Sequence, residues 1–496
     1  MELWQKQKKF MEYLVVACIV SAANVLFGSN YMLSLMVVVL EIVWLILLFV
    51  QGKIADYLCY FMFFMCNCME YAAFTGNETI YCFKNFRIAG INIGIFMLLP
   101  VFFWGLGYYR QLLIIRRGSI ASKFCYGLLG INAIAMLIGV ILILLNDNNI
   151  NSLGNIAYQF IQEAYSMVYM PLAMMIGIAV LSRKKGGALT KINLGLQATL
   201  WANVFQMIVS LVSGIGGTYG YLTTMQVSIL NFLIPFMILM YFYKGEVMYP
   251  KMTLIIGFIG SILALMYNAN GKLIIMFVIC LIVYWYFSIR DGAGIDKMIS
   301  IVSIIVVVAL AGTLVAFLSQ NVLFMAKFED AKALLNIFSA DWLENLPQSP
   351  RVRVEEFRDV FIEYAKKPWL ILTGKGYLGS VKDHTGYFYS HLVSADGFVS
   401  EAEWKYGIFY QLHEIVSYIL IYGFMGIIFL VKYAFKCIHL FLKNHNIWVG
   451  IGIYWFVMFY GYSLTLGTFG CVALLYGLFS SEANENKIVV HGRNKE

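Results

Sequence analysis

The chain has 496 residues, of which 61% are hydrophobic and only 12% are charged. Soluble domains average about half apolar and about a quarter charged residues, so this composition excludes an ordinary soluble protein. The formal net charge of +8 is gathered in short segments between apolar runs, and we therefore interpret it as a signal of membrane topology and not of a nucleic-acid partner.

Apolar runs recur from Phe10 almost to the end of the chain, and many approach the roughly 20 residues that a helix needs to cross a bilayer. We interpret fourteen of them as spans. They lie at about residues 10–28, 31–50, 54–74, 88–108, 122–145, 158–181, 193–214, 221–243, 253–267, 270–288, 298–318, 413–431, 447–463 and 465–480. The ninth and fourteenth are short, so twelve or thirteen full crossings are also compatible with the pattern. The sequence thus predicts an all-α integral membrane protein with about 14 transmembrane helices.

The distribution of Lys and Arg predicts that both termini lie in the cytoplasm. In that orientation the inner segments carry 22 basic residues, whereas the short outer loops carry three, Lys84, Arg87 and Lys272. Cytoplasmic loops are enriched in basic residues, and so uneven a split is hard to obtain from the opposite orientation.

One long polar stretch, residues 320–412, interrupts the series of spans and holds ten of the 35 basic residues. We predict that it forms one large, mainly helical extracytoplasmic loop and carries the chemistry of the protein. The predicted organisation is an N-terminal bundle of about 11 helices (1–319), this loop (320–412), C-terminal spans (413–480) and a cytoplasmic tail (481–496). The first part of the loop, 321–338, has the pattern of an interfacial helix.

A second loop helix carries three arginines. Ser349 is expected to be its N-cap, with Pro350 as the first helical residue, and the helix should end at Lys367 before Pro368. At 100° per residue, its two faces differ in polarity. The apolar arc holds Val354, Phe357, Val360, Phe361 and Tyr364, and the other arc holds Glu355, Glu356, Asp359, Glu363 and Lys366.

Arg353 falls inside the apolar arc of this helix, and Arg351 and Arg358 flank that arc. A cation on a buried face costs free energy unless an anion or hydrogen-bond acceptors meet it. Arg353 should therefore have a dedicated partner, which is either a structural loop carboxylate or an anionic ligand such as a phosphate.

After Pro368 an apolar run ends in Gly374-Lys375-Gly376. A Gly-x-Gly turn lets backbone amides approach a phosphate closely. Without the surrounding pattern of a Walker loop or a Rossmann unit, however, a simple turn is the default interpretation.

The remainder of the loop is rich in titratable side chains, which can serve general acid–base chemistry. They are His384, His391, Asp396, Glu401, Glu403 and His413. The histidine spacings match no H-x-x-x-H or H-E-x-x-H pattern, so we expect no metal. His413 differs from the others because it stands at the mouth of a predicted span, which would hold its side chain rigidly.

Taken in order, these features resemble the bacterial O-antigen polymerase and O-antigen ligase superfamily of lipid-linked polysaccharide enzymes. The shared pattern is a long periplasmic loop with an Arg-x-x-x-aromatic helix, then Pro and Gly-x-Gly. It reads here as Arg353 to Phe357, Pro368 and Gly374-Lys375-Gly376. The loop then closes with a histidine before a span with paired glycines, here His413, Gly423 and Gly426. Where the family often has Ser-Arg-Gly, this chain has Asn270-Gly271-Lys272, in which Lys272 supplies the charge.

This resemblance implies a glycosyltransferase of the bacterial plasma (inner) membrane that builds the O-antigen of lipopolysaccharide or a capsule. A polymerase transfers the growing glycan from undecaprenyl pyrophosphate onto a hydroxyl of the next lipid-linked repeat unit, at the outer face and without metal or cofactor. The implied partners are undecaprenyl-pyrophosphate-linked oligosaccharides and the lipid bilayer, with a chain-length regulator and a flippase as candidate protein partners. A ligase of the same superfamily, or a polysaccharide flippase, is the alternative.

The transfer needs cations for the departing pyrophosphate and a base for the acceptor hydroxyl. We expect Arg353, supported by Arg351 and Lys272, to face the pyrophosphate, because an arginine fork matches phosphate oxygens. His413 is the expected base, with Glu401 or His391 as the next candidates. Arg358 and Lys375 complete the expected substrate-binding residues.

Overall fold

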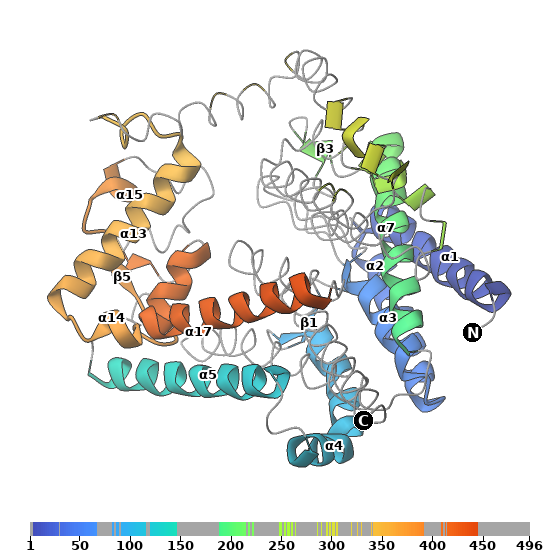
Figure 1. Ribbon diagram of the computed structural model, residues 1–496, viewed down its shortest axis with the longest axis horizontal. Coiled ribbons are helices and arrows are strands. Elements are labelled where there is room, and N and C mark those ends of the chain that lie inside the picture. The colour runs from blue at the N-terminus through green and yellow to red at the C-terminus, as the bar shows by residue number, and fades with distance from the viewer. Residues whose placement is uncertain are drawn as a thin grey trace. The chain divides into compact units, whose positions relative to one another are not determined.

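The computed structural model of the chain consists mainly of helices (Figure 1). It describes residues 3–28, 30–66, 82–83, 86–88, 91–115, 120–145, 188–214, 217–218, 221–222, 248–249, 341–390, 408–409, 412 and 414–444, with scattered positions between 252 and 339. Among these residues, strands occur as three pairs: β1 (Arg87–Ile88) with β2 (Ile91–Asn92), β3 (Gly217–Thr218) with β4 (Tyr221–Leu222), and β5 (Val381–Lys382) with β6 (Ile408–Phe409). The predicted all-α architecture agrees with this part of the chain.

Several helices are apolar enough to lie in a membrane. The long ones are α1 (Leu3–Phe27), α2 (Tyr31–Val50), α4 (Ile93–Ile115), α5 (Ile120–Leu144), α7 (Ala188–Ser213) and α17 (Glu414–Asn444), and α3 (Ile54–Cys66) is shorter. Within the described residues, four segments have the length and hydropathy of a membrane span: Leu3–Phe27, Tyr31–Val50, Tyr126–Leu144 and Val416–Tyr433. The protein is therefore membrane-embedded, and the count of fourteen spans stays a prediction because most of the others lie outside the described residues.

The chain forms two compact units, each assembled from separate stretches of sequence. The first comprises Met1–Phe86, Asn92–Met97 and Lys184–Phe338, and the second comprises Arg87–Ile91, Leu98–Arg183 and Ser339–Glu496. The segments that carry the predicted site residues of the loop thus share a unit with α5 and α17. The sequence-based domain boundaries are not tested by this division.

In the first unit, α1, α3 and α7 are joined by a buried carboxylate. Asp56 on α3 forms ion pairs with Lys9 of α1 at 2.7 Å and with Lys191 of α7 at 2.6 Å. The hydroxyl of Tyr13 donates to the same carboxylate at 2.6 Å. A buried charge is tolerated when it is paired and hydrogen-bonded, so these contacts fix how the three helices are rotated against one another.

In the second unit, loop elements pack on the two candidate spans α5 and α17. The loop elements are α13 (Gln348–Lys366), α14 (Leu370–Thr373), β5, α15 (Tyr387–Ser390) and β6. α17 bends at Gly423, where φ is 61° and ψ is −162°, and beyond the bend it runs beside α5 (Figure 1). One hydrophobic core joins Leu142 of α5, Val360 and Tyr364 of α13, and Leu420 of α17. Loop and spans therefore fold as one body in this unit.

The helix α13 corrects two expectations. It begins at Gln348 with Pro347 in the N-cap position and no side-chain cap, so Ser349 is inside the helix; its end at Lys366, before Pro368, agrees with the prediction. Phe357 of the expected apolar arc is 40% exposed, whereas Glu355, Glu356 and Asp359 of the acidic arc are buried. Asp359 and Glu363 receive donors from the chain that follows α13, whereas Glu355 is paired with arginines of α13 itself.

Candidate functional site

At the bend in α17, three consecutive carbonyls accept hydrogen bonds from loop residues. The hydroxyl of Tyr364 on α13 donates to the carbonyl of Ile419 at 2.7 Å. The amides of Lys375 and Gly376 donate to the carbonyls of Leu420 at 2.6 Å and Ile421 at 3.0 Å. A membrane helix must satisfy its backbone internally or through neighbouring protein, so these bonds hold the loop on α17.

The Gly374-Lys375-Gly376 turn is seated between the two spans. Gly374 and Gly376 have φ of 67° and 68°, in the left-handed region that favours glycine. A Cβ on Gly374 would lie 2.5 Å from the carbonyl oxygen of Ile421, and one on Gly376 would collide with the carbonyl oxygen of Ala135 on α5. The next amide, that of Tyr377, donates to the same Ala135 carbonyl at 3.1 Å. The amides of this turn thus bind protein carbonyls, and the simple structural turn is the correct interpretation.

The side chain of Lys375 points back to α13. It is 2% exposed, and its ammonium lies 2.9 Å from Glu363 and donates to the carbonyl of Ser380 at 2.7 Å. Burial by itself would raise the pKa of Glu363, but the bonds from Lys375 and His384 lower it below its ordinary value. Lys375 therefore supports an ionised Glu363 in this structure. The expected contact between Lys375 and substrate has no support here, because the ammonium is buried and bonded to Glu363 and Ser380.

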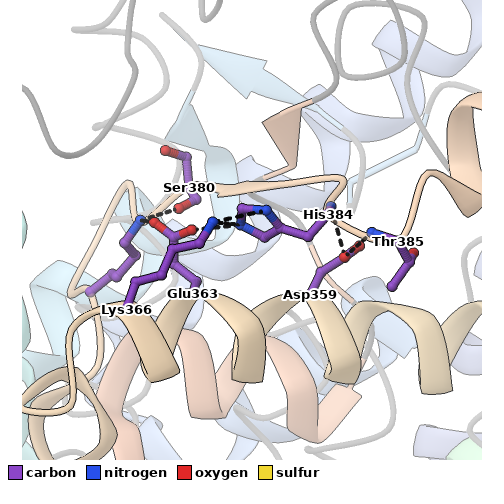
Figure 2. A network of polar contacts seen from close by, with 7 residues as sticks. Asp359, Glu363, Lys366, Ser380, His384 and Thr385 are labelled. Atoms are coloured by element: carbon purple, nitrogen blue, oxygen red, sulfur yellow. Dashed lines mark hydrogen bonds and ion pairs between the residues drawn. The ribbon is translucent and has the colours of Figure 1, made fainter.

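His384 is held at two points by acids of α13 (Figure 2). Its ring Nε2 lies 2.7 Å from a carboxylate oxygen of Glu363, and its backbone N–H donates to Oδ1 of Asp359 at 2.8 Å. Nζ of Lys366 lies 3.2 Å from the other ring nitrogen, Nδ1, and 3.4 Å from Nε2. Asp359, Glu363, Lys366, Lys375 and His384 are named here the acid–base cluster.

Asp359 is the most deeply buried member of the acid–base cluster. It is 0% exposed, and its Oδ1 also accepts the backbone N–H of Thr385 at 2.9 Å. Its second oxygen, Oδ2, has no hydrogen-bond partner among the described residues. Burial raises the pKa of Asp359 to about 7 despite the two backbone bonds. This carboxyl group therefore titrates near neutral pH.

The predicted arginines lie along α13. The guanidinium of Arg351 stacks 4.7 Å from the ring centre of Tyr387, and its Nε lies 3.8 Å from buried Glu355. Arg358 pairs with the other oxygen of Glu355 at 2.9 Å. Arg353 is half-buried on the same helix, one turn before Phe357. The helix thus presents three cations within two turns, two of which share one carboxylate.

Four other expected site residues, Lys272, His391, Glu401 and His413, lie outside the described residues. Sequence reasoning did not single out Asp359, Glu363 and His384 as one constellation. The available signal was the i, i+4 spacing of Asp359 and Glu363, which places them on one helix face, but the sequence separation of 21 between Glu363 and His384 gave no indication of contact.

The arrangement can hold an imidazole in a fixed orientation beside an ionised carboxylate and near a row of cations. Among the described residues, no group of three or more His, Cys, Asp or Glu side chains is placed to bind a metal ion. Comparison with protein-family models, curated proteins and solved structures found no match to this chain.

Proposed function

We propose that this chain is a glycosyltransferase that polymerises lipid-linked polysaccharide repeat units at the outer face of the bacterial plasma membrane. The observation that carries the proposal is the attachment of α13, with Arg351, Arg353 and Arg358, to the broken span α17 through Tyr364. A lipid-linked pyrophosphate presents its charge at the membrane surface. An enzyme for it needs cations fixed relative to a span, and α13 meets that requirement.

The chemistry assigns different tasks to the charged groups. As the acceptor hydroxyl attacks the anomeric carbon, the bond to the pyrophosphate breaks and negative charge develops on the leaving phosphate oxygen. An arginine offers that oxygen a charge-assisted hydrogen bond in fork geometry. We assign this role to Arg353 because it is the arginine of the Arg-x-x-x-aromatic pattern on which the family resemblance rests. His413, the base expected from the resemblance, is left for the test below.

The test is a polymerisation assay in nanodiscs with undecaprenyl-pyrophosphate-linked repeat units extracted from the host, without nucleotide sugars. The wild type should give a ladder of products on a gel. Arg353→Ala should lower turnover by about 10²- to 10³-fold, the range for removing one donor to a developing oxyanion. Lys382→Ala is the matched control, because Lys382 is an exposed basic residue of the same loop.

The outcomes separate the candidate functions. A ladder that Arg353→Ala abolishes and Lys382→Ala preserves supports the polymerase. Transfer of a preassembled glycan to a second acceptor, with no ladder, indicates the ligase. Movement of the lipid-linked unit across liposomes, with no transfer, indicates a flippase and overturns the proposal.

A further inference from the structure

His384 is held far more rigidly than a surface histidine requires. Its ring is fixed by Glu363 at 2.7 Å, and its backbone N–H is fixed by Asp359 at 2.8 Å. Glu363 is in turn held by Lys375, which is 2% exposed and anchored to the Ser380 carbonyl. Burying Lys375 and Asp359 costs free energy. Residues that hold a functional side chain in one orientation are common at functional sites, and Lys375 and Asp359 hold the His384 imidazole in this way.

The contacts of the His384 ring determine which nitrogen carries the proton. An ionised carboxylate only accepts hydrogen bonds. Nε2 must therefore carry the ring proton and donate a hydrogen bond to Glu363. In a neutral imidazole with its proton on Nε2, Nδ1 carries the lone pair. The ammonium of Lys366, which only donates, lies 3.2 Å from Nδ1 and 3.4 Å from Nε2 and is compatible with that tautomer. A neutral imidazole with this tautomer is ready to accept a proton at Nδ1.

His384 lies on the accessible side of the acid–base cluster, together with Glu363 and Lys366. Its side chain is 15% exposed and that of Glu363 is 18% exposed, whereas that of Lys375 is 2% exposed. Lys366, the group in front of Nδ1, is an exposed residue on a flexible stem, and it can move aside for a hydroxyl or approach a leaving phosphate. The charged groups in contact with His384 are therefore Glu363, Lys366 and, through the backbone, Asp359.

We propose that His384 is the general base of the transfer reaction, with Glu363 as its positioning residue. This inference rests on the proposed function. The acceptor hydroxyl gives its proton to Nδ1 while its oxygen bonds to the anomeric carbon. The bond from that carbon to the lipid pyrophosphate breaks, and the pyrophosphate departs with the electron pair. The imidazolium, stabilised by Glu363, then returns the proton to water or to the departing phosphate.

The test measures turnover, KM for the lipid-linked donor and the pH profile of His384→Gln and Glu363→Gln in the assay above. Removing a general base lowers the rate by about 10²- to 10⁴-fold. His384→Gln should show such a fall in turnover with an unchanged KM and should lose the acid limb of the pH–rate profile. Added imidazole should restore part of the activity to His384→Ala. Glu363→Gln should displace the acid limb. His439→Gln is the control, because His439 is an exposed histidine of α17.

Three results would overturn the assignment. Full activity of His384→Gln beside an inactive Arg353→Ala would remove His384 from the reaction and leave the polymerase intact. A parallel loss of thermal stability and activity in His384→Gln, with the acid limb retained and no imidazole rescue in His384→Ala, would show a purely structural role. Loss of the acid limb in His413→Ala alone would assign the base to His413. A wild type that makes no product would remove both proposals.

Discussion

The buried carboxyl group of Asp359 makes the stability of the loop depend on pH. Because burial raises its pKa from the ordinary 3.8 to about 7, Asp359 contributes stability that is fully present below about pH 3.8 and is lost as the pH rises through about 7. Asp359→Asn keeps an oxygen for the backbone N–H groups of His384 and Thr385 but cannot ionise. We therefore expect the variant to lose less stability than the wild type on going from acid to alkaline pH.

The size of the effect follows from the pKa. The difference between 3.8 and about 7 corresponds to about 4 kcal/mol when one pKa step is worth about 1.4 kcal/mol. His384 and Thr385 beside the carboxylate are only half-buried, and water near them screens its charge. We therefore expect about half of that value, about 2 kcal/mol, which is about a 30-fold change in an equilibrium constant.

Amide hydrogen exchange measures this effect locally, because the two N–H groups that donate to Asp359 are themselves probes. Exchange of peptides that contain His384 and Thr385 is compared at pH 4.5 and pH 8.5, after correction for intrinsic rates. The ratio of protection in Asp359→Asn to that in the wild type should rise by about 15-fold between these pH values, because part of the titration lies below pH 4.5. Comparing the two pH values cancels any effect of the substituted side chain at position 359 that does not depend on pH. A ratio that stays the same would refute the reasoning, and Asp341→Asn, at an exposed loop position, should show no change.

Two further predictions concern the attachment of the loop to the spans. Gly376→Ala should destabilise the second unit by more than about 2 kcal/mol, because the new Cβ would meet the Ala135 carbonyl at a positive φ. The control is Gly386→Ala, where a Cβ meets nothing within 4 Å. Equal melting temperatures of the two variants would contradict this prediction. Tyr364→Phe should lower the free energy of unfolding by about 1 to 3 kcal/mol, because it removes the hydroxyl that donates to the Ile419 carbonyl at 2.7 Å. Unchanged resistance to unfolding by SDS would argue against a contribution of that bond.

The parts of the fold that the sequence predicted depend on local signals. The predicted span 31–50 coincides with α2, and the span predicted at 122–145 lies within α5 to within a residue. The end of α13 before Pro368 was also predictable, because proline disfavours a helical residue before it. Hydropathy and proline act on neighbouring residues, so both can be recognised without knowledge of tertiary contacts.

The site depends on contacts that sequence patterns do not encode. Periodicity placed Asp359 and Glu363 on a face opposite the apolar arc, but their burial results from Lys375 and His384, which belong to a later segment. In the same way, Gly423 was recognised as a glycine within a span, and its bend could be understood only once the donors from the loop were located.

The bend in α17 also has a consequence for biosynthesis. A span ordinarily makes its backbone hydrogen bonds within the helix. At its bend α17 also accepts hydrogen bonds from Tyr364, Lys375 and Gly376, which the ribosome makes about 45 to 55 residues earlier. The loop has therefore already been synthesised when α17 enters the bilayer, and its donors can meet these carbonyls at once. In a chain in which α17 preceded the loop, the bend would have to form in the membrane before these donors existed.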